Sequence, residues 1–198
     1  MSDSTDTYSM DDFSRELENP RLRAVLAPAV YHPTADRLAQ ICERYRAEPG
    51  WRMLGCRSGE EIVGCLGLAL GDAGQATIRH IAVAPGRRGH GIGIAMIRHA
   101  VATFALTHLS AETGHEAMDF YRACGFAIQS LGELYPGTER FLCTYTTGED
   151  GIAEAEGASG CACRVGAPFV AQAAQALWQK PQPRSRSTAH VGTCRTGL

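Results

Sequence analysis

The sequence predicts a mixed α/β (α+β) domain, built on a central and largely antiparallel sheet that helices flank. Residues 51–84 contain three consecutive strand-like apolar runs, separated by glycine-containing turns. The hydrophobic period then changes to that of a helix, and a short strand, a second helix and two closing strands follow. This order lacks the repeated strand–helix–strand units of a doubly wound parallel sheet.

The 198 residues suit one folded domain with a tail at each end, because one core typically serves about 100–200 residues. Residues 1–20 carry six acidic side chains against one arginine, so we expect a solvated, disordered acidic arm. We place the domain at 21–147. Residues 148–198 are rich in Gly, Ala, Ser and Pro and predict a low-complexity tail, in which 167–178 could form a short helix.

The first elements of the domain are an apolar run and an amphipathic segment. Residues 22–30 predict a strand, which Pro28 restricts to a sheet edge because proline cannot donate a hydrogen bond to a neighbouring strand. Apolar side chains recur every three or four residues over 35–45, which predicts a helix that ends before Pro49.

The next segment predicts a β-hairpin and a third strand. Residues 51–57 and 61–70 flank Ser58-Gly59, a pair of small residues that serves tight turns. Both faces of 61–70 are largely apolar, so other elements should cover this strand on both sides. The third strand is expected at 75–84.

The C-terminal half of the domain alternates between helices and strands. Thr113 and Glu116 have the spacing of a capping box, in which two side chains bond the first amides of a helix. Gly125 could supply the left-handed residue that ends the same helix. The predicted elements are a helix at 96–104, a strand at 106–111, a helix at 117–124 and closing strands at 126–131 and 140–145.

Composition excludes several classes of partner. A net charge of −2 and a pI near 6.4 predict no binding to nucleic acid, which depends on Lys and Arg contacts to phosphate. No run approaches the ~20 apolar residues of a membrane helix, and no basic-then-apolar leader is present, so we expect no membrane association and a cytoplasmic location. The eight cysteines are mostly isolated in apolar patterns. Only Cys161 and Cys163 lie close together, without the second pair of a zinc site, so we expect no metal.

Glycines gather in residues 81–94, where a strand gives way to a helix. The first amides of a helix lack partners and carry partial positive charge, so they bind phosphate, and glycine lets the backbone approach an anion closely. The P-loop pattern is excluded because no Gly-Lys-Ser/Thr follows, and the glycine spacing does not fit a dinucleotide fingerprint.

The pattern that fits is R-x-x-G-x-G, formed by Arg88, Gly91 and Gly93, with the run Phe120-Tyr121-Arg122-Ala123-Cys124-Gly125-Phe126 about thirty residues later. Over approximately residues 30–145 the chain resembles the GCN5-related N-acetyltransferase (GNAT) superfamily. The resemblance implies the GNAT-type acyl-CoA N-acyltransferase fold, acetyl-CoA as co-substrate and no metal.

The resemblance also implies where acetyl-CoA would bind. The backbone of Ile81, Ala82 and Val83 would bond its pantetheine arm. The Arg88 side chain would cap the turn or add charge. The amides that would hold the pyrophosphate are those of Arg88, Gly89, His90, Gly91, Ile92, Gly93 and Ile94. Gly114 departs from the asparagine that family members often carry seven residues before the tyrosine.

Tyr121 matches the position from which many family members protonate the departing thiolate. A phenol is a suitable donor for a thiolate whose thiol has a pKa of about 8.5. The alternative is that Tyr121 only packs with Phe120 and Ala117. A covalent intermediate on Cys124 is disfavoured, since the superfamily pattern favours direct transfer.

A base must remove a proton before the acceptor amine can attack. Some relatives carry a glutamate where this chain has Thr77, which cannot serve. His80 is one candidate base, because its ordinary pKa of roughly 6.5 suits neutral pH. Strand alternation would place His80 on one face with Ile78 and Ala82. Glu112 is a second candidate and could equally bind a cationic substrate, and a base acting through ordered water stays open.

The predicted activity is that of an acyltransferase, which moves an acetyl group from acetyl-CoA to a primary amine by direct transfer in a ternary complex. The acceptor is a small molecule or a protein amine, and Arg79 or Arg140 could receive an acceptor carboxylate. The alternative is a non-catalytic acyl-CoA-binding or regulatory module on the same fold. The tail could instead act as an interaction arm, and the closing strands could pair two copies as a homodimer.

Overall fold

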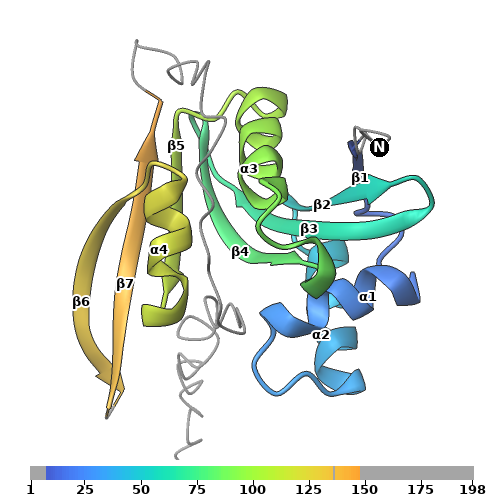
Figure 1. Cartoon of the computed structure of the whole chain (residues 1–198), viewed down its shortest axis with the longest axis horizontal. Coiled ribbons are helices and arrows are strands. Elements are labelled where there is room, and N and C mark those ends of the chain that lie inside the picture. Colours follow the sequence, from blue (N-terminus) through green and yellow to red (C-terminus); the bar gives the residue numbers. More distant parts are fainter. Residues whose placement is uncertain (1–7, 136, 148–198) are drawn as a thin grey trace, which may run out of the picture.

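A computed structural model describes residues 8–135 and 137–147 (Figure 1). Its seven strands form one sheet in the order β1-β2-β3-β4-β5-β7-β6. The strands are β1 Tyr8–Asp12, β2 Trp51–Ser58, β3 Glu61–Leu70, β4 Gln75–Val83, β5 His108–Thr113, β6 Ala127–Tyr135 and β7 Thr138–Thr146. The helices are α1 Pro20–Leu26, α2 Ala35–Ala47, α3 Ile92–Thr103 and α4 His115–Ala123, with short turns of 3-10 helix at Ala27–Ala29 and Pro85–Arg87.

All neighbouring strands are antiparallel except β4 and β5, which α3 connects in parallel. The expectation of a mixed α/β fold with a largely antiparallel sheet is therefore confirmed. None of the described helices is long and apolar enough to cross a membrane.

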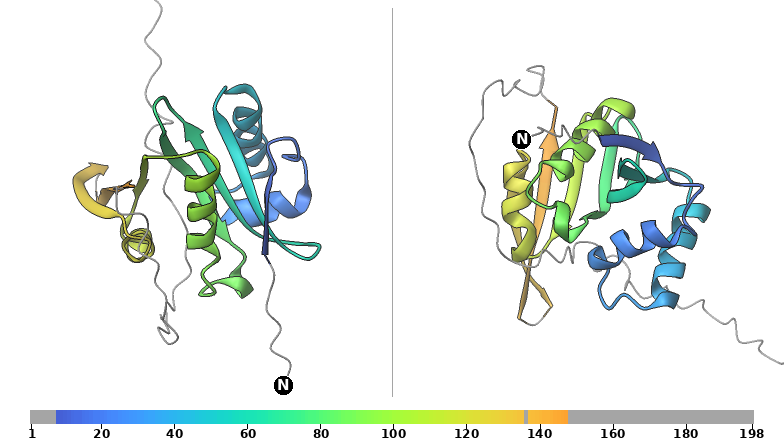
Figure 2. Two further views of the ribbon diagram at one scale, coloured as in Figure 1. Left: turned by 90° about the horizontal axis from the view of Figure 1, so that it is seen from above. Right: turned by 45° about the vertical axis from the view of Figure 1, so that its right-hand side comes forward.

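Helices cover both faces of the sheet, as the apolar faces of β3 predict. α3 packs on β2, β3 and β4, and α4 packs on β5, β6 and β7. α1 and α2 lie on the opposite face of the sheet (Figure 2). One core forms beneath each layer: Leu66, Ile78 and Met96 belong to the α3 side, and Leu22, Tyr45 and Cys65 to the α1/α2 side.

The expectation of a disordered arm over 1–20 is wrong for residues 8–20. β1 pairs with the edge of β2, and Phe13 and Leu17 are 0% and 1% exposed. A Cβ at Gly55 would lie 1.8 Å from the Phe13 ring, so this glycine makes the space that the ring fills. Two buried apolar anchors thus offset the ordering entropy of an otherwise acidic segment. Residues 1–7 lie outside the described residues, as does the proposed helix at 167–178.

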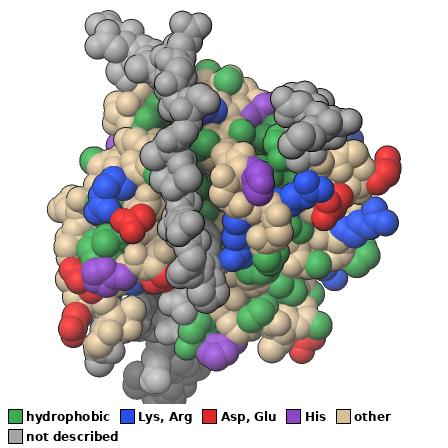
Figure 3. All heavy atoms as spheres, viewed as in Figure 1, with side chains coloured by type: hydrophobic (Ala, Val, Ile, Leu, Met, Phe, Trp, Pro, Cys, Tyr) green, Lys and Arg blue, Asp and Glu red, His purple; other side chains and the backbone are tan. Residues whose placement is uncertain are grey.

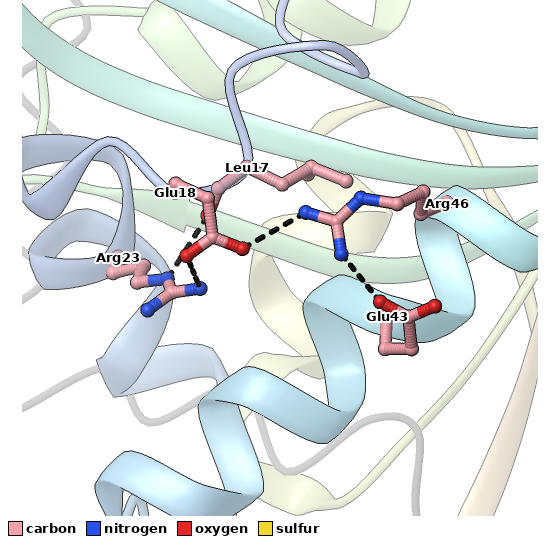
Figure 4. A network of polar contacts seen from close by, with 5 residues as sticks. All are labelled: Leu17, Glu18, Arg23, Glu43 and Arg46. Carbon is pink, nitrogen blue, oxygen red and sulfur yellow. Dashed lines mark hydrogen bonds and ion pairs between the residues drawn. The ribbon is translucent and has the colours of Figure 1, made fainter.

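A charged network joins this N-terminal segment to both helices of its layer (Figure 4). Arg23 donates to the Leu17 carbonyl at 2.9 Å and also bonds the Glu18 carboxylate. Arg46 lies 2.8 Å from Glu18 and also pairs with Glu43. The hydrogen bond from Arg46 is the main cause that lowers the pKa of Glu18. Because the network is exposed, it orients the segment more than it stabilises it.

The predicted strand at 22–30 is wrong, because the segment begins with α1. The Asn19 side chain accepts a bond from the Arg21 amide at 3.0 Å, and Pro20 occupies the first turn, where its missing N–H costs nothing. Leu22 and Leu26, four residues apart, share the buried face. A short apolar run alone does not tell whether a segment is a strand or a helix. The capping residues Asn19 and Pro20, which precede the run, do indicate a helix.

The remaining elements agree with the sequence in kind and order. α3 begins at Ile92, four residues before the expected start, and β6 continues to Tyr135, four residues beyond the expected end. The other differences lie near β5. This strand begins two residues later than expected, at His108. The capping box is wrong: Gly114 is the residue before the first turn of α4, and Thr113 ends β5 with its hydroxyl buried. Gly125 has a φ of +84°, which confirms its role in ending α4.

Candidate active site

The parallel strands β4 and β5 part midway along their length. Their pairing runs from Gln75 with His108 to Ile78 with Ala111 and then stops. β4 continues to Val83 paired with β3 alone, while β5 continues to Thr113 paired with β7. Over 79–83, the edge of β4 that faced β5 therefore has no strand partner within the described residues. Figure 1 shows the two strands diverging beside α3.

A β-bulge lies where the strands part. Gly67 pairs with His80 but Leu68 pairs with Ile78, so Arg79 is the extra residue of β4. Ile78 and Ile81 consequently share the α3-side core, whereas Ala82 belongs to the α1/α2-side core. The expected grouping of Ile78 with His80 and Ala82 is wrong, because the bulge resets the alternation.

The glycine-rich turn leads from β4 into α3. Gly89 and Gly91 have φ values of +80° and +75°, in the region that favours glycine. The Arg88 side chain donates from Nε to the Val83 carbonyl at 3.0 Å, so it caps the turn, and the carbonyl of Val83 is already engaged. The first i→i−4 bond runs from the Ala95 amide to Gly91 at 3.0 Å.

The amides between Arg88 and Ile94 are thus available at the start of α3, since the first amides of a helix have no intrahelical partner. Within the described residues, none of the amides from Arg88 to Gly91 donates to a backbone carbonyl. A Cβ at Gly93 would lie 2.7 Å from the Phe120 ring, so this glycine lets α3 approach α4. The side chain of His90 turns back to the Arg88 carbonyl at 2.9 Å. The turn can accept an anion.

Tyr121 lies on α4 and is 0% exposed. Its ring packs edge-on against Phe120 and Phe126, each with centroids 5.2 Å apart. Its hydroxyl nevertheless has no hydrogen-bond partner among the described residues, and the same holds for the buried hydroxyl of Thr113 at the end of β5. Leaving such a group unpaired costs about 1–3 kcal/mol. Burial raises the pKa of Tyr121, so the phenol keeps its proton as a donor.

The neighbouring thiol is unsuited to covalent catalysis. Burial raises the pKa of Cys124 to about 12, so the thiolate, which is the nucleophilic form, is scarce near neutral pH.

His80 is buried on the α2 side of β4, at 7% exposure. Its Nδ1 lies 2.7 Å from the Tyr45 hydroxyl. A Cβ at Gly67 would lie 1.8 Å from that oxygen, so glycine is required there. Burial, and then the charge of Arg79, lower the pKa of His80 to about 4. The ring is neutral near pH 7, and its geometry favours holding α2 to the bulge over accepting a proton.

Glu112 and Arg79 lie on either side of the point where the strands part. Each follows the last β4–β5 pair, Ile78 with Ala111, by one residue. Glu112 is half-buried and pairs with Leu142 of β7. The Arg79 guanidinium lies 5.3 Å from the centre of the Trp51 ring, and burial lowers the pKa of Arg79.

Elsewhere on the surface seen in Figure 3, arginine and carboxylate side chains are interspersed over the described residues.

Sequence reasoning missed the Tyr45–His80 bond, the Thr113 hydroxyl and the place of Trp51 beside Arg79. One signal was available for the first of these. A glycine inside an apolar strand, here Gly67, often marks a close approach of another group.

A parallel strand pair that parts beside a helix with open first-turn amides is the architecture of the acyl-CoA N-acyltransferase fold. Residues 12–126, more than half of the chain, match the model of the Acetyltransferase (GNAT) family. The chain belongs to this family. The comparison with curated protein sequences found no match.

Solved structures share the same fold. A GNAT-family protein from Desulfovibrio desulfuricans is 19% identical with a TM-score of 0.61, over 71% of this chain and 99% of that one. The ribosomal-protein-S18-alanine N-acetyltransferase from Escherichia coli is 15% identical with a TM-score of 0.58, over 73% and 98%. A GNAT family acetyltransferase from Elizabethkingia anophelis, solved with acetyl-CoA bound, is 20% identical with a TM-score of 0.54, over 72% and 99%. Identities this low bear on the fold and not on the acceptor.

Proposed function

We propose that this GNAT-family acetyltransferase moves an acetyl group from acetyl-CoA to a primary amine, by direct transfer while both are bound. The observation that carries the proposal is the buried Tyr121 hydroxyl, which has no partner among the described residues and lies on the helix that packs against α3 through Phe120 and Gly93. A buried donor of this kind fits a ligand atom that needs a proton.

The residues present fit acetyl-CoA. The amides from Arg88 to Ile94 would hold the pyrophosphate, because they combine unpaired N–H groups with the positive end of α3. At Ile81 and Ala82, the edge of β4 that has no neighbouring strand offers its backbone N–H and C=O groups. The pantetheine arm would bond these groups in the way that a neighbouring strand does. The Elizabethkingia relative is described with acetyl-CoA bound, which supports the choice of co-substrate. When bound, acetyl-CoA supplies an activated acyl group.

Tyr121 would hold a proton at Oη and give it to the sulfur that leaves. Its raised pKa keeps that proton in place until the sulfur becomes basic. The new bond joins the amine nitrogen to the acetyl carbon, the bond from that carbon to sulfur breaks, and the sulfur departs as a thiol that carries the Tyr121 proton. The proton that the nitrogen loses on forming the amide returns through water to the Tyr121 phenolate.

Of the two side chains considered as bases, the geometry favours Glu112 over His80 as the one that meets the acceptor. His80 is buried against Tyr45 with a pKa of about 4. Glu112 lies where the strands part, on the face that leads to α1 and α2. We propose that its carboxylate attracts the acceptor ammonium, and that the proton leaves through water rather than by full transfer to Glu112.

A panel of primary amines, assayed by the free thiol released from acetyl-CoA, tests the proposal. We expect turnover with the wild type, and a loss of about 10²–10⁴-fold in kcat for Tyr121→Phe with unchanged acetyl-CoA binding by calorimetry. Wild-type turnover in Tyr121→Phe would reduce this side chain to a packing role. Tight acetyl-CoA binding without thiol release from any amine would favour the non-catalytic module instead.

A further inference from the structure

Two side chains of opposite charge flank the point where β4 and β5 part, on the α1/α2 face of the sheet. Arg79 lies on this face because its guanidinium contacts Trp51, which packs against the α1/α2-side core. Glu112 lies on it because alternation along β5 turns it away from Ala111, a member of the α3-side core.

These two charges attract each other without closing into an ion pair. Burial lowers the pKa of Arg79, while the negative charge of Glu112 acts in the opposite direction and raises it. The guanidinium of Arg79 and the carboxylate of Glu112 nevertheless form no ion pair within 4.0 Å among the described residues. An arginine and a glutamate that meet freely would form a bidentate pair. Here Trp51 holds the guanidinium by a cation–π contact, so both charged groups stay available for a ligand.

Arg79 also has an unused donor. Its Nε is buried and has no hydrogen-bond partner within the described residues. Leaving a buried donor of a charged group unpaired is costly, and the arginine fork matches the two oxygens of a carboxylate. Arg140, the other arginine considered for this role, is itself buried on β7, at 5% exposure, whereas Arg79 is half-buried beside the split.

We propose that the acceptor is a small zwitterion of the α-amino acid class. Glu112 receives its ammonium group and Arg79 its carboxylate, so the amine is placed between the parted strands. This inference rests on the proposed acetyl transfer and names the substrate class of the same site. A protein N-terminus or a lysine side chain within a protein has no free carboxylate on the same residue, and such acceptors would leave Arg79 unsatisfied.

The test compares each amino acid of a standard panel with its own α-amide, at saturating acetyl-CoA and with thiol detection. The pair keeps the side chain and removes the carboxylate charge. Because the amide also has the less basic amine, the two compounds are compared at equal concentrations of unprotonated amine. We expect kcat/KM to be at least about tenfold higher for the acid, the range of one charge-assisted hydrogen bond. Equal or faster acetylation of the amides would overturn the inference while leaving the proposed acetyl transfer intact.

Arg79→Gln should lower kcat/KM for the acid by about 10–100-fold and change the amide little, so that the preference for the acid collapses. Arg52→Gln is the matched control. It removes the same charge one residue from Trp51, on the opposite face of β2, where Arg52 pairs with Leu68 of the α3-side core. A preference that survives in Arg79→Gln, or falls equally in Arg52→Gln, contradicts the assignment.

Calorimetry of an amino acid added to the protein saturated with CoA tests acceptor binding without turnover. We expect heat of binding for the wild type and Arg52→Gln and its loss in Arg79→Gln. If Arg79→Gln does not fold, Arg79→Lys keeps the charge but not the planar fork, and an intermediate loss of affinity is expected. No binding of any amino acid to the wild type would refute the inference, whether or not neutral amines are acetylated.

Discussion

Replacing His80 by glutamine should remove a large part of the acid sensitivity of the fold. The folded pKa of His80 is about 4, and the unfolded chain has the ordinary value of about 6.5. The unfolded state therefore binds more protons throughout that interval, and stability falls as the pH falls. The stability that depends on a neutral His80 is fully present above pH 6.5 and is progressively lost as the pH falls toward 4.

The size of the effect follows from these two pKa values. Between about pH 8 and about pH 5, protonation of the unfolded imidazole lowers the free energy of unfolding by about 2 kcal/mol. His80 is 7% exposed, so solvent screening removes little of this. The carboxylates of Glu18 and Glu139, whose pKa values are lowered, also lose stabilisation in acid, so the difference between wild type and variant is the quantity to measure.

Urea denaturation at a series of pH values provides the assay. We expect the wild type to lose about 2 kcal/mol more than His80→Gln over this range. His99 is a half-buried histidine on α3 that bonds Thr103, and His99→Gln is the matched control because it makes the same imidazole-to-amide change away from Tyr45. Parallel curves for wild type and His80→Gln would refute the buried, neutral imidazole and would restore His80 as a candidate base.

Three further substitutions test other parts of the account. Gly67→Ala should destabilise the fold by about 1–3 kcal/mol, because its Cβ would lie 1.8 Å from the Tyr45 hydroxyl; an unchanged melting temperature would contradict the close approach. Phe13→Ala should cost about 3–5 kcal/mol in urea denaturation, since the ring is 0% exposed, and a loss near zero would return this segment to a loose arm. Gly91→Ala places a side chain at a φ of +75°, which costs about 1–2 kcal/mol, and should raise the Kd for acetyl-CoA roughly tenfold. The control is Gly59→Ala, which is also at positive φ but lies in the β2–β3 turn and should leave that Kd unchanged.

The motifs located the glycine-rich turn, at which we propose that acetyl-CoA binds, because backbone geometry there depends on local sequence. Gly89 and Gly91 sit at positive φ, and Arg88 caps the turn through the Val83 carbonyl, all within a few residues of one another. Hydrophobic period likewise predicted α2, β2, β3, β4 and α3, whose apolar faces are long enough to distinguish the two periods.

The errors arose where contacts distant in sequence decide the structure. Phe13 is ordered by the space at Gly55, which no local pattern reveals. The bulge at Arg79 depends on the register of β3 against β4 and moved His80 to the α2 face. The capping box at Thr113 failed because β5 extends through that residue. The sequence named Arg79 and Glu112 separately, but their place on either side of the point where β4 and β5 part, with Trp51 of β2 beside Arg79, depends on three strands.

The proposed acetyl transfer requires that the amides at the start of α3 bind a diphosphate. Calorimetry with acetyl-CoA and with S-acetylpantetheine, which keeps the thioester but lacks the diphosphate and the rest of the nucleotide, tests this most directly when wild type and Gly91→Ala are compared. We expect acetyl-CoA to bind at least about a hundredfold more tightly, because the helix start and its unpaired amides act only on the anion. Equal affinity of the two compounds, or no binding of acetyl-CoA at millimolar concentration, would contradict the account.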